Sequence, residues 1–154
     1  HRFIHKGKLP NGGFSRNILA NQSTTMAACY TLRIITDFSS AHSLRDYPGD
    51  CNRLHGHNWK LEVEATAASV DHTGMAIDFR TLKNAAREVA GRLDHRFLNE
   101  VAPFDRLNPT AENIAEYLYK EIAKMVSTPQ LWISAVVLWE TERACVRYTE
   151  ERLT

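Results

Sequence analysis

Alternation of apolar and polar residues predicts four strands in this chain. Every second residue from Tyr30 to Phe38 is large and mostly apolar. The same period of two, which is typical of strands, recurs in three later segments: Trp59–Ala67, Ile133–Glu140 and Ala144–Tyr148. Met75–Ile77 is expected to begin a short return strand. The pattern therefore places hairpin-like strand pairs near both ends of the chain.

Two segments between these strands have apolar residues at helical spacing. The first runs from Phe79 to Leu93 after Asp78, and the second follows Thr110. Asp78 and Thr110 are predicted helix N-caps, because a side-chain oxygen at that position can accept a hydrogen bond from a free backbone N–H. Ser39–Asp50 is predicted to be a loop, since Pro48-Gly49-Asp50 is a turn signal.

The order strand, strand, helix, helix, strand, strand predicts an α+β fold. We expect an antiparallel four-stranded sheet with both helices on one face, formed by residues 26–154 as a single domain. Residues 1–25 have little periodicity, and Met26 is interpreted as the natural start. The leader is accordingly interpreted as derived from cloning. The alternative is a native arm that docks on a neighbouring subunit.

Charge and composition narrow the class of protein. With 19 basic and 18 acidic side chains and a formal net charge of +1, the chain gives no electrostatic reason to expect nucleic acid or an anionic membrane as a partner. No apolar run approaches the ~18 residues of a membrane span. Three cysteines are too few for a secreted disulfide framework, so a cytoplasmic location is expected. Cys29 and Cys145 are predicted to be buried in strands.

Cys51–Trp59 holds most of the candidate chemistry. His55 and His57 lie two residues apart, so both face the same side of a strand. With His42 they form a set of three imidazoles, the usual catalytic zinc site with one open position, and zinc is favoured over iron or manganese. Cys51 is either a fourth ligand that closes the site, or a thiol beside the metal whose thiolate acts as base or nucleophile.

Two other signals are weaker on their own residues. Asp94 directly precedes His95, and a carboxylate can orient or charge a neighbouring imidazole for proton transfer, although most such pairs are merely solvated. Glu140 follows an apolar strand and could accept two parallel hydrogen bonds from the N–H and amino group of a flat heterocycle. A solvated edge-strand glutamate is the favoured interpretation of Glu140 from its sequence context.

Six motifs occur in the order found in one family. They are Asp37-Phe38-Ser39-Ser40-Ala41-His42, Cys51-x-x-x-His55-Gly56-His57-Asn58, Gly74-Met75-Ala76-Ile77-Asp78-Phe79, Leu93-Asp94-His95-Arg96-Phe97-Leu98-Asn99, Asn108-Pro109-Thr110-Ala111-Glu112-Asn113 and Trp139-Glu140-Thr141. Over about residues 30 to 150 the chain resembles the 6-pyruvoyl-tetrahydropterin synthase and 6-carboxytetrahydropterin synthase family. Trp139 departs from the pattern, because a basic residue often precedes the glutamate. Residues 1–25 match no part of it.

The resemblance implies roles for seven side chains: zinc ligands His42, His55 and His57, the catalytic thiol Cys51 with proton-transfer partners Asp94 and His95, and Glu140 as the anchor of the pterin ring. It also implies the tunnelling fold, in which strands of several subunits close a β-barrel. Such proteins are commonly hexamers made of two trimers, with active sites between subunits. Arg45, Arg53 and Lys60 lie near the second motif and are candidate cations for a triphosphate.

The three residues between Cys51 and His55 resemble the bacterial 6-carboxytetrahydropterin synthases of queuosine biosynthesis, as does Ile77-Asp78-Phe79; animal pyruvoyl enzymes usually have a longer insert. The implied substrate is 7,8-dihydroneopterin triphosphate, and the implied products are 6-carboxy-5,6,7,8-tetrahydropterin, acetaldehyde and triphosphate. One alternative is the 6-pyruvoyl-tetrahydropterin synthase reaction, which stops at triphosphate loss and internal redox. A non-catalytic protein that binds pterin or zinc is the other.

Overall fold

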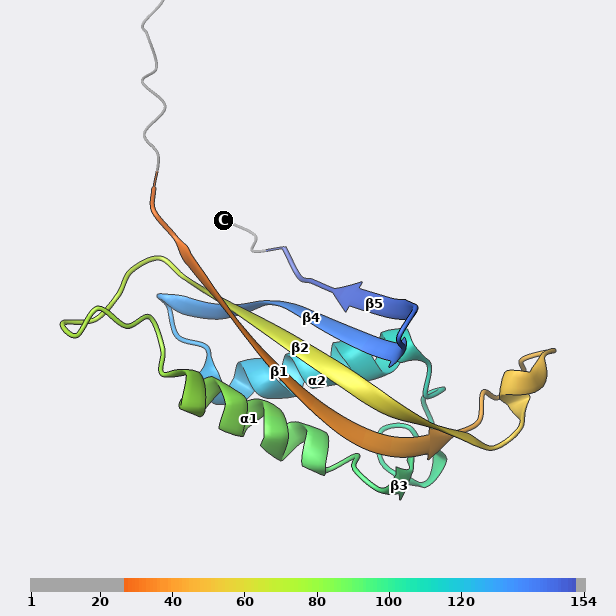
Figure 1. Ribbon diagram of the computed structural model, residues 1–154. Coiled ribbons are helices and arrows are strands. Elements are labelled where there is room, and N and C mark those ends of the chain that lie inside the picture. The colour runs from red at the N-terminus through yellow and green to blue at the C-terminus, as the bar shows by residue number, and fades with distance from the viewer. Residues whose placement is uncertain (1–26, 152–154) are drawn as a thin grey trace, which may run out of the picture.

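Two helices cover one face of a five-stranded sheet, and the other face is left open (Figure 1). This computed structural model describes residues 27–151, so the expectation for residues 1–25 lies outside the described residues. Its elements are β1 Tyr30–His42, η1 Asp50–Asn52, β2 His55–Ala67, α1 Phe79–Gly91, β3 Arg96–Phe97, η2 Leu98–Glu100, α2 Ala111–Val126, β4 Leu131–Thr141 and β5 Ala144–Tyr148. The predicted α+β class is confirmed.

The strand order is β3-β1-β2-β4-β5. The four predicted strands form antiparallel pairs in the order β1, β2, β4 and β5. The prediction of four strands is wrong in number, because Arg96 and Phe97 add a short parallel strand beside Ser40 and Ala41 of β1. A two-residue strand has no periodicity that the sequence could show.

Strand β1 is longer than predicted. It runs through to His42, which lies directly opposite His55, so the loop expected to start at Ser39 begins only after His42. The return strand expected at Met75–Ile77 is absent from the described structure. The Asp71 carboxylate instead accepts hydrogen bonds from the backbone N–H groups of Thr73 and Met75, which favours a turn over a ladder.

The core lies between the helices and alternate residues of the three central strands. Its fully buried members include Trp59, Leu61, Val63 and Leu138 from the sheet, Leu82 and Val89 from α1, and Ile114, Leu118 and Ile122 from α2. The two predicted N-caps are confirmed, since Asp78 accepts from the Arg80 N–H and Thr110 from the Asn113 N–H. Toward the N-terminal end of β2, Trp59 is the last residue of the core. The two preceding residues on the same face of the strand are His57 and His55.

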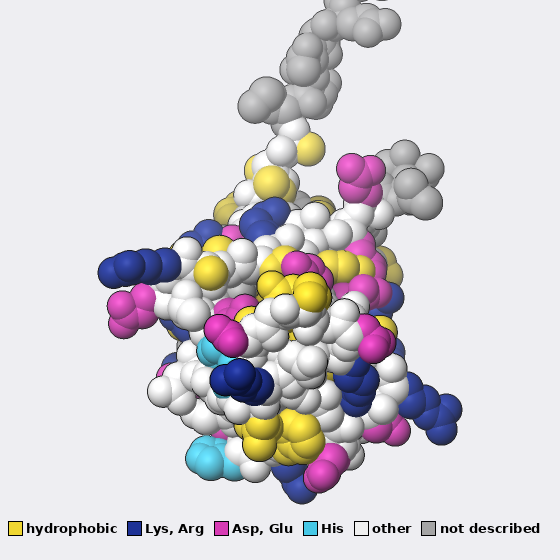
Figure 2. Space-filling model, turned by 90° about the vertical axis from the view of Figure 1, so that its right-hand side faces the viewer, with side chains coloured by type: hydrophobic (Ala, Val, Ile, Leu, Met, Phe, Trp, Pro, Cys, Tyr) yellow, Lys and Arg dark blue, Asp and Glu magenta, His cyan; other side chains and the backbone are white. Residues whose placement is uncertain are grey.

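Charged side chains pair across the open face of the sheet. Glu64 accepts from Arg33 and Arg147, and Glu62 lies near Arg33 and Lys60. Basic and acidic side chains are also interspersed over the end of the molecule that Figure 2 shows, in agreement with the low net charge. No described helix is both long and apolar enough to cross a membrane. Cys29 and Cys145, which were predicted to be buried, are exposed.

Candidate metal centre

Three histidines and one glutamate converge where β1, β2 and β4 meet. The ligand atoms of His42, His55, His57 and Glu140 all lie within 4.8 Å of one another. Strand register brings them together: His42 is opposite His55, and His57 is the next residue of β2 that faces the same side. Strand β4 adds Glu140 just beyond its last pairing with β2 at Trp139. Sequence spacing indicates the three histidines as one set, whereas nothing in the local sequence places Glu140 among them.

Backbone carbonyls fix the orientation of two of the rings. His42 Nδ1–H donates to the Pro109 carbonyl and His55 Nδ1–H to the Arg53 carbonyl, both at 2.7 Å. Because a carbonyl only accepts, each Nδ1 carries the proton and each Nε2 presents a lone pair. The two Nε2 atoms are 3.0 Å apart. Two lone pairs this close repel one another unless a cation lies between them.

His57 provides the third imidazole of the group. His57 Nε2 is buried and has no hydrogen-bond partner among the described residues, although Glu140 Oε1 lies 3.0 Å away. A buried ring nitrogen that makes no hydrogen bond in a native structure needs an explanation. Neutral imidazole nitrogens oriented by second hydrogen bonds are the ligands that zinc prefers. The residues present therefore fit a divalent cation such as zinc.

Burial keeps the imidazoles of His42 and His57 neutral, and the neutral form is the one that binds metal. It lowers the pKa of His42, whose side chain is 1% exposed, and the nearby rings of His55 and His57 lower this pKa further, against the opposing effects of the Pro109 carbonyl and Glu140. Burial is also the largest cause of the lowered pKa of His57. Both imidazoles are therefore neutral near neutral pH.

The Asn108-Pro109 motif supports His42 from outside the sheet. The Asn108 side chain accepts from the Arg45 N–H and donates to the Arg45 carbonyl, which holds the adjoining Pro109 carbonyl against His42 Nδ1. The Arg45 guanidinium donates to four backbone carbonyls, those of Asn99, Phe104, Asp105 and Leu107. Arg45, a candidate triphosphate contact from the sequence, is thus engaged in holding this loop.

The other two candidate cations differ in their surroundings. Lys60 lies 3.4 Å from Glu62 and over the ring of Trp139. Arg53 is exposed at the end of η1. Of the three cations, Arg53 is the one whose side chain the described contacts leave most accessible to a solvated anion.

Asp94 and His95 contact each other beside β1, at the edge of the sheet. Asp94 Oδ1 accepts from the Ser39 N–H at 2.8 Å, and Asp94 Oδ2 lies 2.9 Å from His95 Nδ1. These two contacts lower the pKa of Asp94, so its carboxylate stays charged. His95 adopts a left-handed backbone (φ 55°) and its N–H donates to the Ser39 carbonyl. The carboxylate therefore orients an imidazole whose side chain is 81% exposed.

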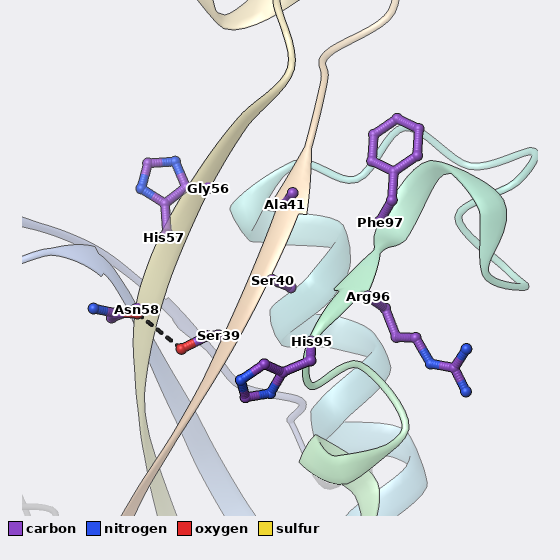
Figure 3. A pocket seen from close by; sticks show the side chains of 9 residues that line it. All are labelled: Ser39, Ser40, Ala41, Gly56, His57, Asn58, His95, Arg96 and Phe97. Atoms are coloured by element: carbon purple, nitrogen blue, oxygen red, sulfur yellow. Dashed lines mark hydrogen bonds between the residues drawn. The ribbon is translucent and has the colours of Figure 1, made fainter.

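Two cavities flank the metal-ligand group. One, of about 490 Å³, is lined by both His57 and His95 (Figure 3), which lie on opposite sides of β1. The other, of about 420 Å³, is lined by His42 and Glu140. His95 thus lines the same cavity as one ring of the histidine cluster, but neither Asp94 nor His95 belongs to the ligand group.

Cys51 lies in η1, the turn that joins β1 to β2, and is half-buried. Its carbonyl accepts from the Leu44 N–H, which ties the turn to the end of β1. Its sulfur is not one of the four ligand atoms that converge. A role for this thiol beside the metal stays a prediction.

Removal of the Asn108 side chain should loosen the carbonyl that orients His42. We expect Asn108→Ala to weaken zinc binding by about 10–100-fold, as loss of outer-shell partners of metal ligands usually does. Competition with a chromogenic chelator measures this. Asn84→Ala, an exposed change on α1, is the matched control. Equal zinc affinity in the two variants would show that the Asn108 side chain is not needed to hold the Pro109 carbonyl against His42.

Acidification should destabilise the metal-free protein. Because the pKa values of His42 and His57 lie below their ordinary 6.5 in the folded protein, the unfolded chain binds more protons as the pH falls below about that value. Their contribution to stability is therefore present above pH 6.5 and is lost on acidification. Urea unfolding of the metal-free protein at several pH values between 7.5 and 5.5 should show this, with a shallower dependence for His42→Asn. An identical slope in that variant would contradict the assignment.

Comparison with known proteins shows the family of this chain. The family model for 6-pyruvoyl tetrahydropterin synthase matches residues 31–151. The 6-carboxy-5,6,7,8-tetrahydropterin synthase of Rickettsia typhi is 31% identical over 128 residues, covering 71% of this chain and 93% of the relative. The 6-pyruvoyl tetrahydrobiopterin synthase of Drosophila melanogaster is 34% identical over 128 residues, covering 80% and 74%. Relatives of this chain at similar identities therefore carry the names of both reactions.

The fold is also similar to that of solved structures. The 6-pyruvoyl tetrahydropterin synthase of Caenorhabditis elegans superposes with a TM-score of 0.72 at 29% identity, covering 80% of this chain and 97% of that one. The resemblance seen in the six motifs is thus confirmed by the sequence match and by the fold. This chain belongs to the 6-pyruvoyl tetrahydropterin synthase family.

Proposed function

We propose that this protein is a zinc-dependent 6-carboxytetrahydropterin synthase. It would convert 7,8-dihydroneopterin triphosphate and water to 6-carboxy-5,6,7,8-tetrahydropterin, acetaldehyde and triphosphate, as a cytoplasmic enzyme of queuosine biosynthesis. The convergence of His42, His55 and His57 on one point is the observation that carries the proposal. The three-residue spacing between Cys51 and His55, together with relatives named for this activity, supports the carboxy branch.

The chain's own side chains supply binding and proton transfer. Zinc, when bound by the three histidines, would act as a Lewis acid toward the hydroxyls of the substrate side chain. We assign Cys51 as the base that removes a proton from that side chain. Asp94 holds His95 in position to return protons, and the Glu140 carboxylate accepts from the ring N–H and amino group. The cavity beside His42 and Glu140 is the candidate place for the ring.

We further propose that the active protein is a homohexamer of two trimers with sites between subunits. In the described part of the chain, β1 pairs on its outer side only at Ser40 and Ala41, so Tyr30–Ser39 offers an open edge. Unpaired strand edges favour pairing with another chain. The exposed His95 imidazole is accordingly available to a site on a neighbouring copy, where it could meet Cys51, and strand pairing between copies would close a barrel.

Replacement of Cys51 separates binding from chemistry. We expect Cys51→Ala to keep zinc and pterin binding but to lower kcat by about 10²–10⁴-fold, the usual contribution of a general base. Steady-state assays with metal analysis of the same samples measure both. Cys145→Ala, at an exposed cysteine of β5, should keep near-normal turnover. Full activity of Cys51→Ala would remove the thiol from the mechanism.

Product analysis distinguishes the two reactions. Incubation of the zinc-loaded protein with 7,8-dihydroneopterin triphosphate should yield acetaldehyde and 6-carboxy-5,6,7,8-tetrahydropterin, identified by mass. The 34% identity to an enzyme named for the pyruvoyl reaction makes 6-pyruvoyl-tetrahydropterin the specific alternative product. Triphosphate release without acetaldehyde would assign the pyruvoyl reaction. Binding of pterin without any product would instead identify a non-catalytic pterin-binding protein.

A further inference from the structure

Tyr47 presents an aromatic ring at the surface beside the metal-ligand group. The residue is 47% exposed, and its hydroxyl makes no hydrogen bond with a described residue. It lies in the turn between β1 and β2, which extends beyond the ends of both strands (Figure 1). The ring is therefore available for contact with a bound molecule.

Hydrogen bonds hold the turn on either side of Tyr47. Before it, the Arg45 backbone is paired with the Asn108 side chain. After it, the Cys51 carbonyl accepts from the Leu44 N–H, which joins the two ends of the turn. Because both flanks are held, the backbone at Tyr47 is in place before a ligand binds. A contact that is formed in advance costs less entropy when the ligand arrives.

Gly49 leaves room for the tyrosine ring. A Cβ atom at this position would lie 2.6 Å from Cε1 of Tyr47 and 3.3 Å from its Cζ. The backbone of Gly49 is extended (φ −119°, ψ −176°), a conformation that any residue adopts. The glycine is thus required by the space that the ring occupies and not by the backbone. The ring lies directly against Gly49, in a place that a larger residue would not permit.

Tyr47 lines the cavity of about 420 Å³ that is also lined by His42 and Glu140. The N-terminal end of α2 contributes Thr110 and Ala111 to the same cavity. A flat heteroaromatic ring packs favourably on an aromatic side chain, because apolar surface leaves water and the two π-systems attract each other in offset or edge-on arrangements. Tyr47 therefore offers this cavity an apolar surface suited to a flat ring.

We propose that Tyr47 packs against the pterin ring and determines the specificity of the site for flat, bicyclic heterocycles. The inference rests on the proposed function and adds to it a contact with a face of the ring. The contact needs the aromatic ring of Tyr47 and not its hydroxyl. Gly49 is a positioning residue in this arrangement, because it leaves the space in which the tyrosine ring lies.

Binding of a pterin without a hydroxylated side chain tests this contact by itself. We expect Tyr47→Ala to weaken the binding of 6-methylpterin by about 5–150-fold, the usual effect of removing an aromatic side chain on which a base stacks. Tyr47→Phe should bind like the wild type. Met125→Ala, the control, removes an exposed apolar side chain of α2 that lines neither cavity beside the metal-ligand group. Fluorescence titration measures these affinities.

A double-mutant cycle tests the role assigned to Gly49. Gly49→Ala should weaken the binding of 6-methylpterin, because the added methyl group displaces the Tyr47 ring. In a Tyr47→Ala background the same change should have no further effect, since the ring that it displaces is absent. An equal effect of Gly49→Ala in both backgrounds would overturn the positioning role of the glycine.

Zinc binding separates loss of the ring contact from loss of structure. Chelator competition should give every variant the zinc affinity of the wild type, since neither Tyr47 nor Gly49 belongs to the ligand group. Unchanged binding of 6-methylpterin by Tyr47→Ala would overturn the inference and leave the proposed function intact. Equally weak binding by Tyr47→Ala and Tyr47→Phe would assign the contact to the hydroxyl and overturn the packing of the rings. Absence of binding by the wild type would overturn pterin recognition in the proposed function, and this inference with it.

Discussion

The site depends on a convergence of lone pairs that the protein alone does not neutralise. Backbone carbonyls hold His42 and His55 so that two unprotonated nitrogens face each other at 3.0 Å. The buried Nε2 of His57, which belongs to the same group, has no hydrogen-bond partner among the described residues. Burial disfavours protonation as a remedy, because it lowers the pKa of His42 and of His57. A metal cation between the nitrogens would relieve this repulsion. The hydrogen bonds that orient the rings therefore also favour the binding of a metal.

The sheet fixes the positions of the three histidines relative to one another. Cross-strand pairing fixes His42 opposite His55, and the fully buried Trp59 packs edge-on against the rings of His42 and His57. The two hydrogen bonds between the Asn108 side chain and the Arg45 backbone add support from the loop that precedes α2. Glu140 differs from the histidines, because it is the extra residue of a bulge and lies just beyond the end of the pairing between β2 and β4.

The Asp94–His95 pair combines a fixed orientation with an exposed position. A strained left-handed residue and two hydrogen bonds to Ser39 hold the imidazole in place, yet its side chain is 81% exposed. Backbone strain of this kind persists only where the surroundings impose it and is commonly found at functional sites. An oriented, exposed imidazole beside an open strand edge is what the proposed assembly of several copies would use.

Local sequence patterns predict the α+β class, the two helices with their caps, and the grouping of the three histidines. Each of these depends on local spacing: a period of two for strands, of 3.6 for helices, and two residues between ligands on one strand. The fifth strand could not be predicted, since Arg96 and Phe97 pair with residues more than fifty positions away. Glu140 as a member of the metal group was likewise decided only by tertiary structure, because register between β2 and β4 and the bulge in β4 bring it to the histidines. Spacing along a chain records which residues share a face, whereas the meeting of distant strands depends on packing that no local pattern encodes.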